Sequence, residues 1–93
     1  LVSDPGTRFH YSNLSSNWLG IIVDRSCGMN LKAFAEIHLF SPLDVEPGDW
    51  GQDAEGHNNG CGDLHIAARD AAKFGLAYLN EGIYEGKQII PED

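Results

Sequence analysis

The sequence has little cysteine, few basic residues and no long apolar run, and each shortage excludes a class of protein. Its 2 cysteines are not spaced as Cys-x-x-Cys, which argues against a zinc or thioredoxin-type site. With 6 Lys and Arg against 14 Asp and Glu, the net charge of −8 argues against nucleic acid or an anionic membrane surface as a partner. No apolar stretch reaches the roughly 18 residues of a membrane span. The scattered charges indicate a solvated surface.

Motifs for cofactors and metals are also missing. The sequence contains no phosphate-binding loop, dinucleotide fingerprint or Gly-x-Ser-x-Gly nucleophile turn. Its 4 histidines include no pair at helical i, i+4 spacing, so we expect no zinc and no other cofactor. One stretch rich in oxygen donors leaves calcium open as an alternative, although the spacing does not fit an EF-hand loop. The histidines are His10, His38, His57 and His65, and the oxygen donors are Asp49, Asp53, Glu55, Asn58, Asn59 and Asp63.

The first half of the chain predicts two helices. The first runs over residues 13–26, because apolar residues recur at helical spacing and Gly28 can take the left-handed stop. The second runs over residues 31–39, capped by Asn30 and ended before Pro42, since the residue before a proline is pushed out of the helical region. The expected inward stripes are Leu14, Trp18 and Ile21/Ile22 in the first helix, and Leu31, Phe34, Ala35 and Ile37 or His38 in the second.

The second half predicts a loop, a helix and a small hairpin. Residues 46–63 are rich in Gly, Asn, Asp and Glu, which indicates a long irregular loop with Trp50 packed at its base. The third helix covers residues 68–79 and lacks a capping side chain at Ala67. Its inward stripe is expected to be Ala71, Phe74 and Ala77/Tyr78, it should end between Asn80 and Gly82, and the hairpin over residues 83–90 should turn at Glu85-Gly86.

A turn just before the first helix brings three polar side chains to the helix end. Pro5-Gly6 predicts the turn, the next residues are extended, and Tyr11, Ser12 and Asn13 then stand where the first free N–H groups of the helix point outward. One interpretation is an ordinary cap, in which Ser12 or Asn13 accepts a bond from the first turn and Tyr11 packs as a half-buried staple. The other is a substrate site built on the same residues.

Five motifs in one order resemble a known family. They are Pro5-Gly6-Thr7-Arg8-Phe9-His10-Tyr11-Ser12-Asn13, Gly28-Met29-Asn30-Leu31-Lys32-Ala33-Phe34, Phe40-Ser41-Pro42-Leu43, Gly60-Cys61-Gly62-Asp63-Leu64 and Ala68-Arg69-Asp70-Ala71-Ala72-Lys73-Phe74-Gly75. Their succession resembles the serine β-lactamase and penicillin-binding-protein superfamily, in its class C β-lactamase, DD-peptidase and esterase branch. The resemblance implies a mostly α fragment, with three helices, a long loop and a small hairpin, of the α/β β-lactamase/transpeptidase-like fold.

The same resemblance implies roles for Tyr11 and Asn13. In that family a serine of a Ser-x-x-Lys motif attacks an amide or ester carbonyl, and the tyrosine that Tyr11 matches takes the serine proton and passes it to the leaving group. A phenol titrates near about pH 10, so this role needs cations close by. Arg8 is the nearest cation in sequence but lies in an extended run, so the family's lysines would have to supply them. Asn13 would orient the substrate carbonyl and bond the motif lysine, and Ser12 is a helix-start residue.

The other half of such a site is missing from the sequence. No serine has a lysine three residues later, and no Lys-Thr-Gly or His-x-Gly element follows; Lys73-Phe74-Gly75 has a similar spelling but lies inside a predicted helix. We therefore interpret residues 1–93 as a partial domain, the central portion of a serine hydrolase. Its substrate would be a small molecule or peptide, namely a β-lactam, a D-Ala-D-Ala peptide or an ester, and the piece alone would be inactive. The alternative is a non-catalytic helical interaction or calcium-binding module.

Two further expectations follow from the resemblance. Enzymes of this superfamily are generally exported, which implies a periplasmic or extracellular parent in which Cys27 and Cys61 form a disulfide; two independent small core residues are the alternative. The helices would expose faces made for a sheet that this chain does not contain. The isolated chain is therefore expected to be loosely packed or self-associating.

Overall fold

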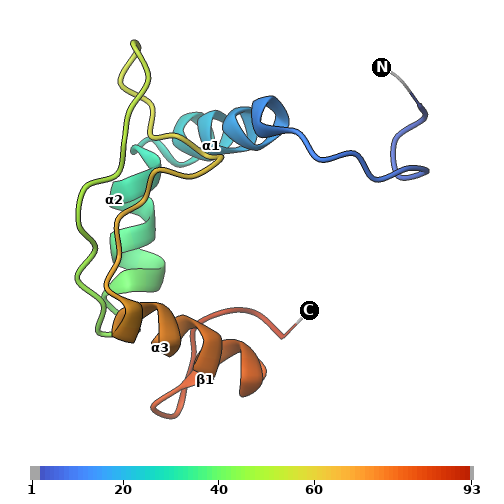
Figure 1. Cartoon of the computed structure of the whole chain (residues 1–93). Coiled ribbons are helices and arrows are strands. Elements are labelled where there is room, and N and C mark those ends of the chain that lie inside the picture. Colours follow the sequence, from blue (N-terminus) through green and yellow to red (C-terminus); the bar gives the residue numbers. More distant parts are fainter. Residues whose placement is uncertain (1–2, 93) are drawn as a thin grey trace.

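The computed structural model describes residues 3–92, and helices make up most of its regular structure (Figure 1). In chain order the elements are α1 (Asn13–Cys27), α2 (Leu31–Ala35), the π-helix η1 (Glu36–Phe40), α3 (Ala68–Leu79), β1 (Ile83–Tyr84) and β2 (Lys87–Gln88). The predicted mostly helical arrangement with a small hairpin is confirmed. An arm over residues 3–12 precedes α1 and leads away from the rest of the chain (Figure 1). Within residues 3–92 no helix is long and apolar enough to cross a bilayer.

Both ends of α1 are set by residues that the sequence predicted. The Ser12 side chain accepts a hydrogen bond from the Ser15 N–H at 3.2 Å. At the other end, Gly28 takes the left-handed conformation with a φ of 68°, and its N–H donates to the Asp24 carbonyl at 3.1 Å. The helix therefore runs one residue past the predicted end, to Cys27.

The apolar stripe of α1 was predicted to face inward, and in the structure it faces outward. Leu14, Trp18 and Ile22 are 69%, 54% and 54% exposed, whereas the buried residue of this helix is Gly20. Ile21 is half-buried, and the exposure of the other three residues agrees with the expectation that the helices expose faces made for an absent sheet; among the described residues, α1 packs mainly by its opposite, small and polar face. A methyl group added to Gly20 would lie 3.3 Å from the Cα of Gly60, so the two backbones are close there.

The second predicted helix changes its winding halfway along. Asn30 caps α2 as predicted, accepting the Ala33 N–H at 2.8 Å. From Glu36 the chain continues as η1, in which the Ser41 N–H donates to the Glu36 carbonyl at 2.9 Å. This π-helical bond holds Ser41 at helical angles, φ −61° and ψ −46°, so the expectation that Pro42 forces it out of the helical region was wrong.

The wider π turn also moves the inward face of this helix. Ala35 and Phe40 are buried, while Ile37 and His38 are exposed. The predicted inward position at Ile37 or His38 was therefore wrong. A π turn holds more residues than an α turn, so the buried face continues from Ala35 to Phe40.

Residues 48–65, here called the ribbon, contain no helix or regular strand, in agreement with the predicted long loop, but backbone hydrogen bonds pair their two halves antiparallel. The Gly48 N–H donates to the His65 carbonyl, and the Asn59 N–H to the Gly51 carbonyl, each at 2.8 Å. A turn at residues 53–56 closes the tip. The prediction rested on composition, and backbone pairing between two Gly-rich and Asn-rich segments leaves no mark in composition.

α3 begins and ends where the sequence predicted. Ala67 provides no side-chain cap, and the helix closes at Asn80. Of the expected inward stripe, Ala77 is fully buried but Phe74 and Tyr78 are exposed. The stripe was therefore predicted correctly at Ala77 and wrongly at Tyr78, whereas Ala71 and Phe74 line an apolar hollow beside the core.

The predicted hairpin follows α3. β1 and β2 pair antiparallel, with Ile83 opposite Gln88 and Tyr84 opposite Lys87. Glu85 and Gly86 make the turn with φ values of 48° and 80°, both in the left-handed region that a type I′ turn requires. The turn position is therefore the one expected from the sequence.

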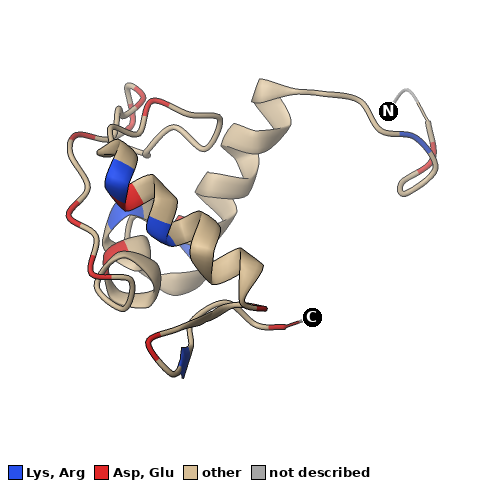
Figure 2. Cartoon of the chain, turned by 60° about the horizontal axis from the view of Figure 1, so that its bottom comes forward, with Lys and Arg blue, Asp and Glu red and all other residues tan. Residues whose placement is uncertain are grey.

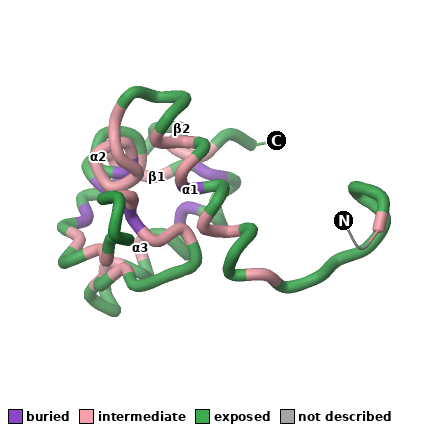
Figure 3. Tube along the Cα trace, turned by 90° about the horizontal axis from the view of Figure 1, so that it is seen from above, coloured by how far each residue is buried: buried purple, intermediate pink, exposed green. Residues whose placement is uncertain are grey.

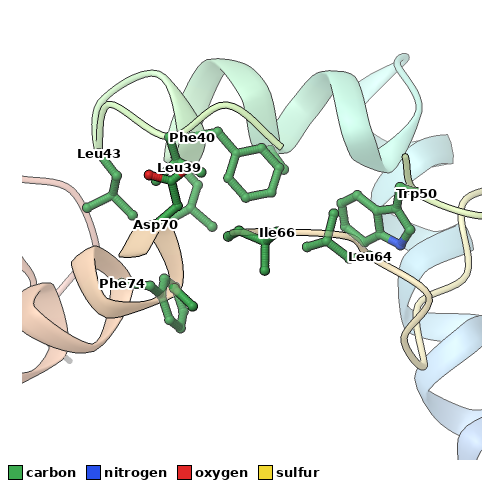
Figure 4. A pocket seen from close by; sticks show the side chains of 11 residues that line it. Leu39, Phe40, Leu43, Trp50, Leu64, Ile66, Asp70 and Phe74 are labelled. Atoms are coloured by element: carbon green, nitrogen blue, oxygen red, sulfur yellow. The ribbon is translucent and has the colours of Figure 1, made fainter. Parts of the chain in front are cut away.

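The core lies where η1, the ribbon and α3 meet, and most of the remaining surface is exposed (Figure 3). Beside the core is an open apolar hollow of about 280 Å³, in which Asp70 is the charged member (Figure 4). The buried core residues are Ala35, Phe40, Leu43, Val45 and Ala77, with Leu39, Trp50, Leu64, Ile66, Tyr84, Ile89 and Ile90 packed against them.

Candidate active site

The arm before α1 opens with the predicted turn. The Thr7 N–H and hydroxyl both donate to the Asp4 carbonyl, at 3.2 and 2.6 Å, and Gly6 has a φ of 78°. Pro5 and Gly6 thus occupy the central positions of a turn that needs a left-handed residue second. Residues 8–11 form no helix or strand and lead directly into α1 (Figure 1).

Tyr11, Ser12 and Asn13 meet different surroundings at the start of α1. Ser12 is the cap, which confirms its predicted place as a helix-start residue. Tyr11 is 76% exposed, so it is not the half-buried staple of the ordinary-cap interpretation. Asn13 is the first residue of α1 and is exposed as well. A phenol and an amide, neither of which the cap uses, thus flank Ser12 in sequence at the start of the helix, where its free N–H groups lie.

α1 turns one face toward the ribbon, and Asn13 lies at the beginning of that face. Residues three and four apart are neighbours on a helix, so Ser16 and Asn17 follow Asn13 along the same side. Gly60 touches this side, because a methyl group added to it would collide with the Ser16 carbonyl oxygen. The Cys61 N–H donates to the Asn17 side-chain oxygen at 3.0 Å. The returning side of the ribbon therefore meets α1 from Ser16 to Gly20, about one to two helical turns beyond Asn13.

A charged contact joins the ribbon to the far end of α1. The His57 Nδ1 lies 3.0 Å from the Asp24 carboxylate, and its Nε2 lies 3.6 Å from the Glu55 carboxylate. The hydrogen bond to Asp24 raises the pKa of His57; partial burial opposes this, and the negative charges of Asp24, Asp53 and Glu55 add to the rise. Acidic residues are spread along the ribbon (red in Figure 2), so the surroundings favour a protonated ring.

Two further side chains hold the ribbon in shape. Asn58 is 3% exposed; its Oδ1 accepts the Lys32 N–H at 2.9 Å, and its Nδ2 donates to the Trp50 carbonyl at 3.3 Å. The Trp50 indole N–H is shared between the carbonyls of Asn59 and Gly62, at 2.9 and 3.2 Å. Trp50 is packed at the base of the loop as predicted. The burial of Asn58 was not predicted, because an asparagine in a Gly-rich stretch gives no sign of long-range contact.

Cys27 and Cys61 are free and exposed, so the structure contains neither the expected disulfide nor the alternative of two buried core residues. Cys61 is held at Asn17 through its backbone N–H, whereas Cys27 is the last residue of α1. Residues 17 and 27 of a helix are separated by about 15 Å along its axis. A disulfide needs Cα atoms about 4.4 to 6.8 Å apart, which this arrangement does not allow.

No group of three or more His, Cys, Asp or Glu side chains within residues 3–92 is arranged to hold a metal ion. Two of the oxygen donors considered for calcium are engaged in the fold itself. The Asp53 carboxylate accepts the N–H groups of Glu55 and His57, at 2.9 and 3.0 Å, and Asn58 is buried against α2. The calcium alternative has no support in this geometry.

Lys73 forms ion pairs and a hydrogen bond within the fold. Its Nζ lies 3.2 Å from the Asp70 carboxylate and 3.8 Å from that of Asp44, and it also donates to the Asp44 carbonyl. These contacts tie α3 to the turn at Asp44, which has a left-handed φ of 55°. Lys73-Phe74-Gly75 lies inside α3, as predicted, and not on a strand.

Comparison with known proteins agrees with this geometry. A family model described as Beta-lactamase matches residues 1–91. A solved structure from Bacillus anthracis, which carries the name of a 6-aminohexanoate-dimer hydrolase, is 31% identical and superposes with a TM-score of 0.85. That match covers 97% of this chain and 24% of the other, so the chain spans about a quarter of the length of that protein. No curated protein matches the chain.

The family match extends over nearly the whole sequence, and the structural match covers the same stretch. The fold is therefore part of a β-lactamase fold, with the helices and hairpin described above. The chain belongs to the β-lactamase family.

Proposed function

We propose that this chain supplies the tyrosine and the asparagine of an acyl-transfer site in a serine hydrolase, which acts on an amide or ester through an acyl-enzyme. One observation carries the proposal: Tyr11 and Asn13 are exposed on either side of Ser12, which alone caps α1. The family match over residues 1–91 supports it, since the Tyr-x-Asn spacing falls within that match.

Each side chain has a separate task in this proposal. The Tyr11 phenolate takes the proton of the nucleophilic serine and then gives it to the leaving group. The Asn13 amide orients the substrate carbonyl. The phenolate form requires cations nearby. Arg8 is the nearest cation in sequence, but it lies in the same exposed, extended arm. We therefore assign the supply of positive charge near Tyr11 to lysines in the rest of the hydrolase.

The isolated chain is expected to be inactive. It contains neither a Ser-x-x-Lys nor a Lys- or His-x-Gly element on a strand. Acyl transfer needs nucleophile, base and oxyanion donors converging within about 3 Å. The activity would therefore belong to a longer protein, in keeping with a match that covers 24% of the neighbouring structure.

The proposed substrate is an amide or ester, and short linear amides are the substrates to assay first. The Bacillus anthracis neighbour is named for the hydrolysis of a 6-aminohexanoate dimer, which adds short linear amides to the β-lactams, D-Ala-D-Ala peptides and esters considered above. We further propose that the parent protein acts in the periplasm or outside the cell, which fractionation of the producing cells would test.

The decisive test uses the full-length hydrolase and a fluorophosphonate or penicillin probe. Tyr11→Phe should slow labelling of the nucleophile at least about a hundredfold, because general acid–base catalysis contributes that much or more. Tyr78→Phe removes the same hydroxyl from an exposed ring on α3 and should label like wild type. Equal labelling of Tyr11→Phe and wild type would make Tyr11 a structural residue and the start of α1 an ordinary helix cap.

A further inference from the structure

The ribbon contains the one Asn-Gly pair of the sequence, Asn59-Gly60, and both residues are half-buried. We infer that this pair is a deamidation site that the folded ribbon keeps closed, and that Trp50 is the residue that positions it. The inference is independent of the proposed function, because it concerns a chemical change in the chain itself.

Deamidation requires a particular approach of two neighbouring groups. The Gly60 backbone nitrogen attacks the side-chain carbonyl carbon of Asn59. An N–C bond forms, the bond to Nδ2 breaks, and ammonia leaves with the proton of the Gly60 N–H. Water then opens the resulting succinimide ring to aspartate or isoaspartate. Glycine favours the attack because it has no Cβ to hinder its nitrogen and lets the backbone turn freely.

The packing of the ribbon on α1 requires the glycine of this pair. A methyl group at Gly60 would collide with the Ser16 carbonyl oxygen and would lie 3.2 Å from the Cα of Asn17. A methyl group at Gly20 would in turn lie 3.3 Å from the Cα of Gly60. Any side chain at position 60 would push the two backbones apart. The fold therefore keeps a labile pair at this contact.

Hydrogen bonds hold the backbone on both sides of the pair. The Asn59 N–H donates to the Gly51 carbonyl at 2.8 Å, and the Asn59 carbonyl accepts the Trp50 indole N–H at 2.9 Å. Beyond Gly60, the Cys61 N–H donates to a side chain of α1 at 3.0 Å. Closure of the succinimide ring must rotate the peptide group that carries the Asn59 carbonyl. The reaction therefore has to wait until the ribbon opens locally.

The Asn59 side chain is held less firmly than its backbone. Its Nδ2 lies 3.5 Å from the Asp63 carboxylate, which is longer than an ordinary N–H···O bond. Protection thus rests on the backbone and on Trp50. Deamidation would place a second negative charge beside Asp63, and isoaspartate would add a methylene to the backbone where Gly60 packs on α1. The ribbon could not then re-form the same contacts.

The test follows residue 59 in the full-length protein during incubation at mildly alkaline pH. Peptide mapping with fragmentation measures the conversion of amide to acid and the isoaspartate formed. A synthetic peptide of residues 55–64, kept in the same buffer, gives the rate without the fold. The folded protein should deamidate at Asn59 at least about tenfold more slowly than the peptide, because only the locally open fraction reacts. Equal rates would overturn the inference.

Substitutions separate positioning by Trp50 from general stability. Trp50→Phe removes the indole N–H but keeps an aromatic ring, and it should speed deamidation at Asn59 severalfold. Trp18→Phe removes the same group from a 54% exposed ring on α1 and should react like wild type. Val45→Ala weakens the core without removing a bond to Asn59, so it should also leave the rate unchanged.

Two results with these variants would show that Trp50 does not position the pair. One is a wild-type rate in Trp50→Phe, and the other is equal acceleration by Trp50→Phe and Val45→Ala, which would mean that deamidation follows global unfolding. If Trp50→Phe does not fold, the comparison of the wild-type protein with the peptide still decides whether the ribbon protects Asn59.

Discussion

His57 connects the ribbon to α1 through a contact that depends on its own protonation. The Asp24 carboxylate, 3.0 Å from Nδ1, holds the pKa of His57 above its ordinary value of 6.5, with Asp53 and Glu55 contributing. A group whose pKa is raised by folding stabilises the folded state fully below its unfolded pKa. That stabilisation is lost as the pH rises through the raised, folded-state pKa.

We therefore predict that Asp24→Asn lowers the pKa of His57 and removes the loss of stability that the wild type shows as the pH rises above about 6.5. NMR titration of the His57 ring gives the pKa, and melting temperatures over the same pH range give the stability. His10→Gln is the control, because His10 is exposed in the arm. A wild-type pH dependence retained in Asp24→Asn would show that this contact does not link protonation to folding.

Single residues were predictable where their role is local. Ser12 and Asn30 cap helices and Gly28 ends one, and in each case the partner is at most four residues away. Asn17 and Asn58 also make well-defined hydrogen bonds, but their partners lie 44 and 26 residues away. A side chain's type and its neighbours in sequence do not identify such partners.

At the scale of elements, the existence of each helix was predictable and its buried face was not. The outward stripe of α1 has the spacing of a core-facing stripe, and only the described fold shows that a glycine on the other side makes the contact. The π winding of η1 likewise moved the buried face from Ile37 to Phe40. A face is defined by what packs against it, and much of what would cover these helices is not in this chain.

α3 has no side-chain hydrogen bond at its N-cap, and a substitution at Ala67 can supply one. Ala67 has the extended conformation of an N-cap residue, φ −67° and ψ 144°, but no side chain to accept a bond. Ala67→Thr should stabilise the protein by about 1 kcal/mol. Denaturant unfolding measures the change, with Ala68→Thr as a control inside the first turn, which should cost a few tenths of a kcal/mol. An unchanged stability in Ala67→Thr would place the start of α3 elsewhere.

The whole molecule exposes more surface than a self-contained protein of its mass. Its accessible surface is 6969 Å², against about 5,300 Å² for a folded monomer of 10.2 kDa. Its radius of gyration is 14.7 Å, where a compact chain of this length has about 12 Å. The arm over residues 3–12, which leads away from the rest of the chain, contributes to both values (Figure 1). Exposed apolar side chains add to the surface, with Leu14, Trp18, Leu19 and Ile22 on α1 and Phe74, Leu76, Tyr78 and Leu79 on α3.

These faces lead to the prediction that the isolated chain self-associates or remains loosely packed, since uncovered apolar surface of this extent is rarely tolerated by a monomer. Sedimentation velocity should show concentration-dependent association, and a hydrophobic dye should bind. Ile22→Glu places a charge on the exposed apolar face of α1 and should weaken association. The control is Ile37→Glu, because Ile37 is 57% exposed and Ile22 is 54% exposed, but Ile37 lies in η1, outside the apolar faces of α1 and α3. It should have less effect. A sharp, cooperative melt of a monomer would contradict the prediction, because the described residues would then suffice for a stable domain and the apolar faces would need no partner.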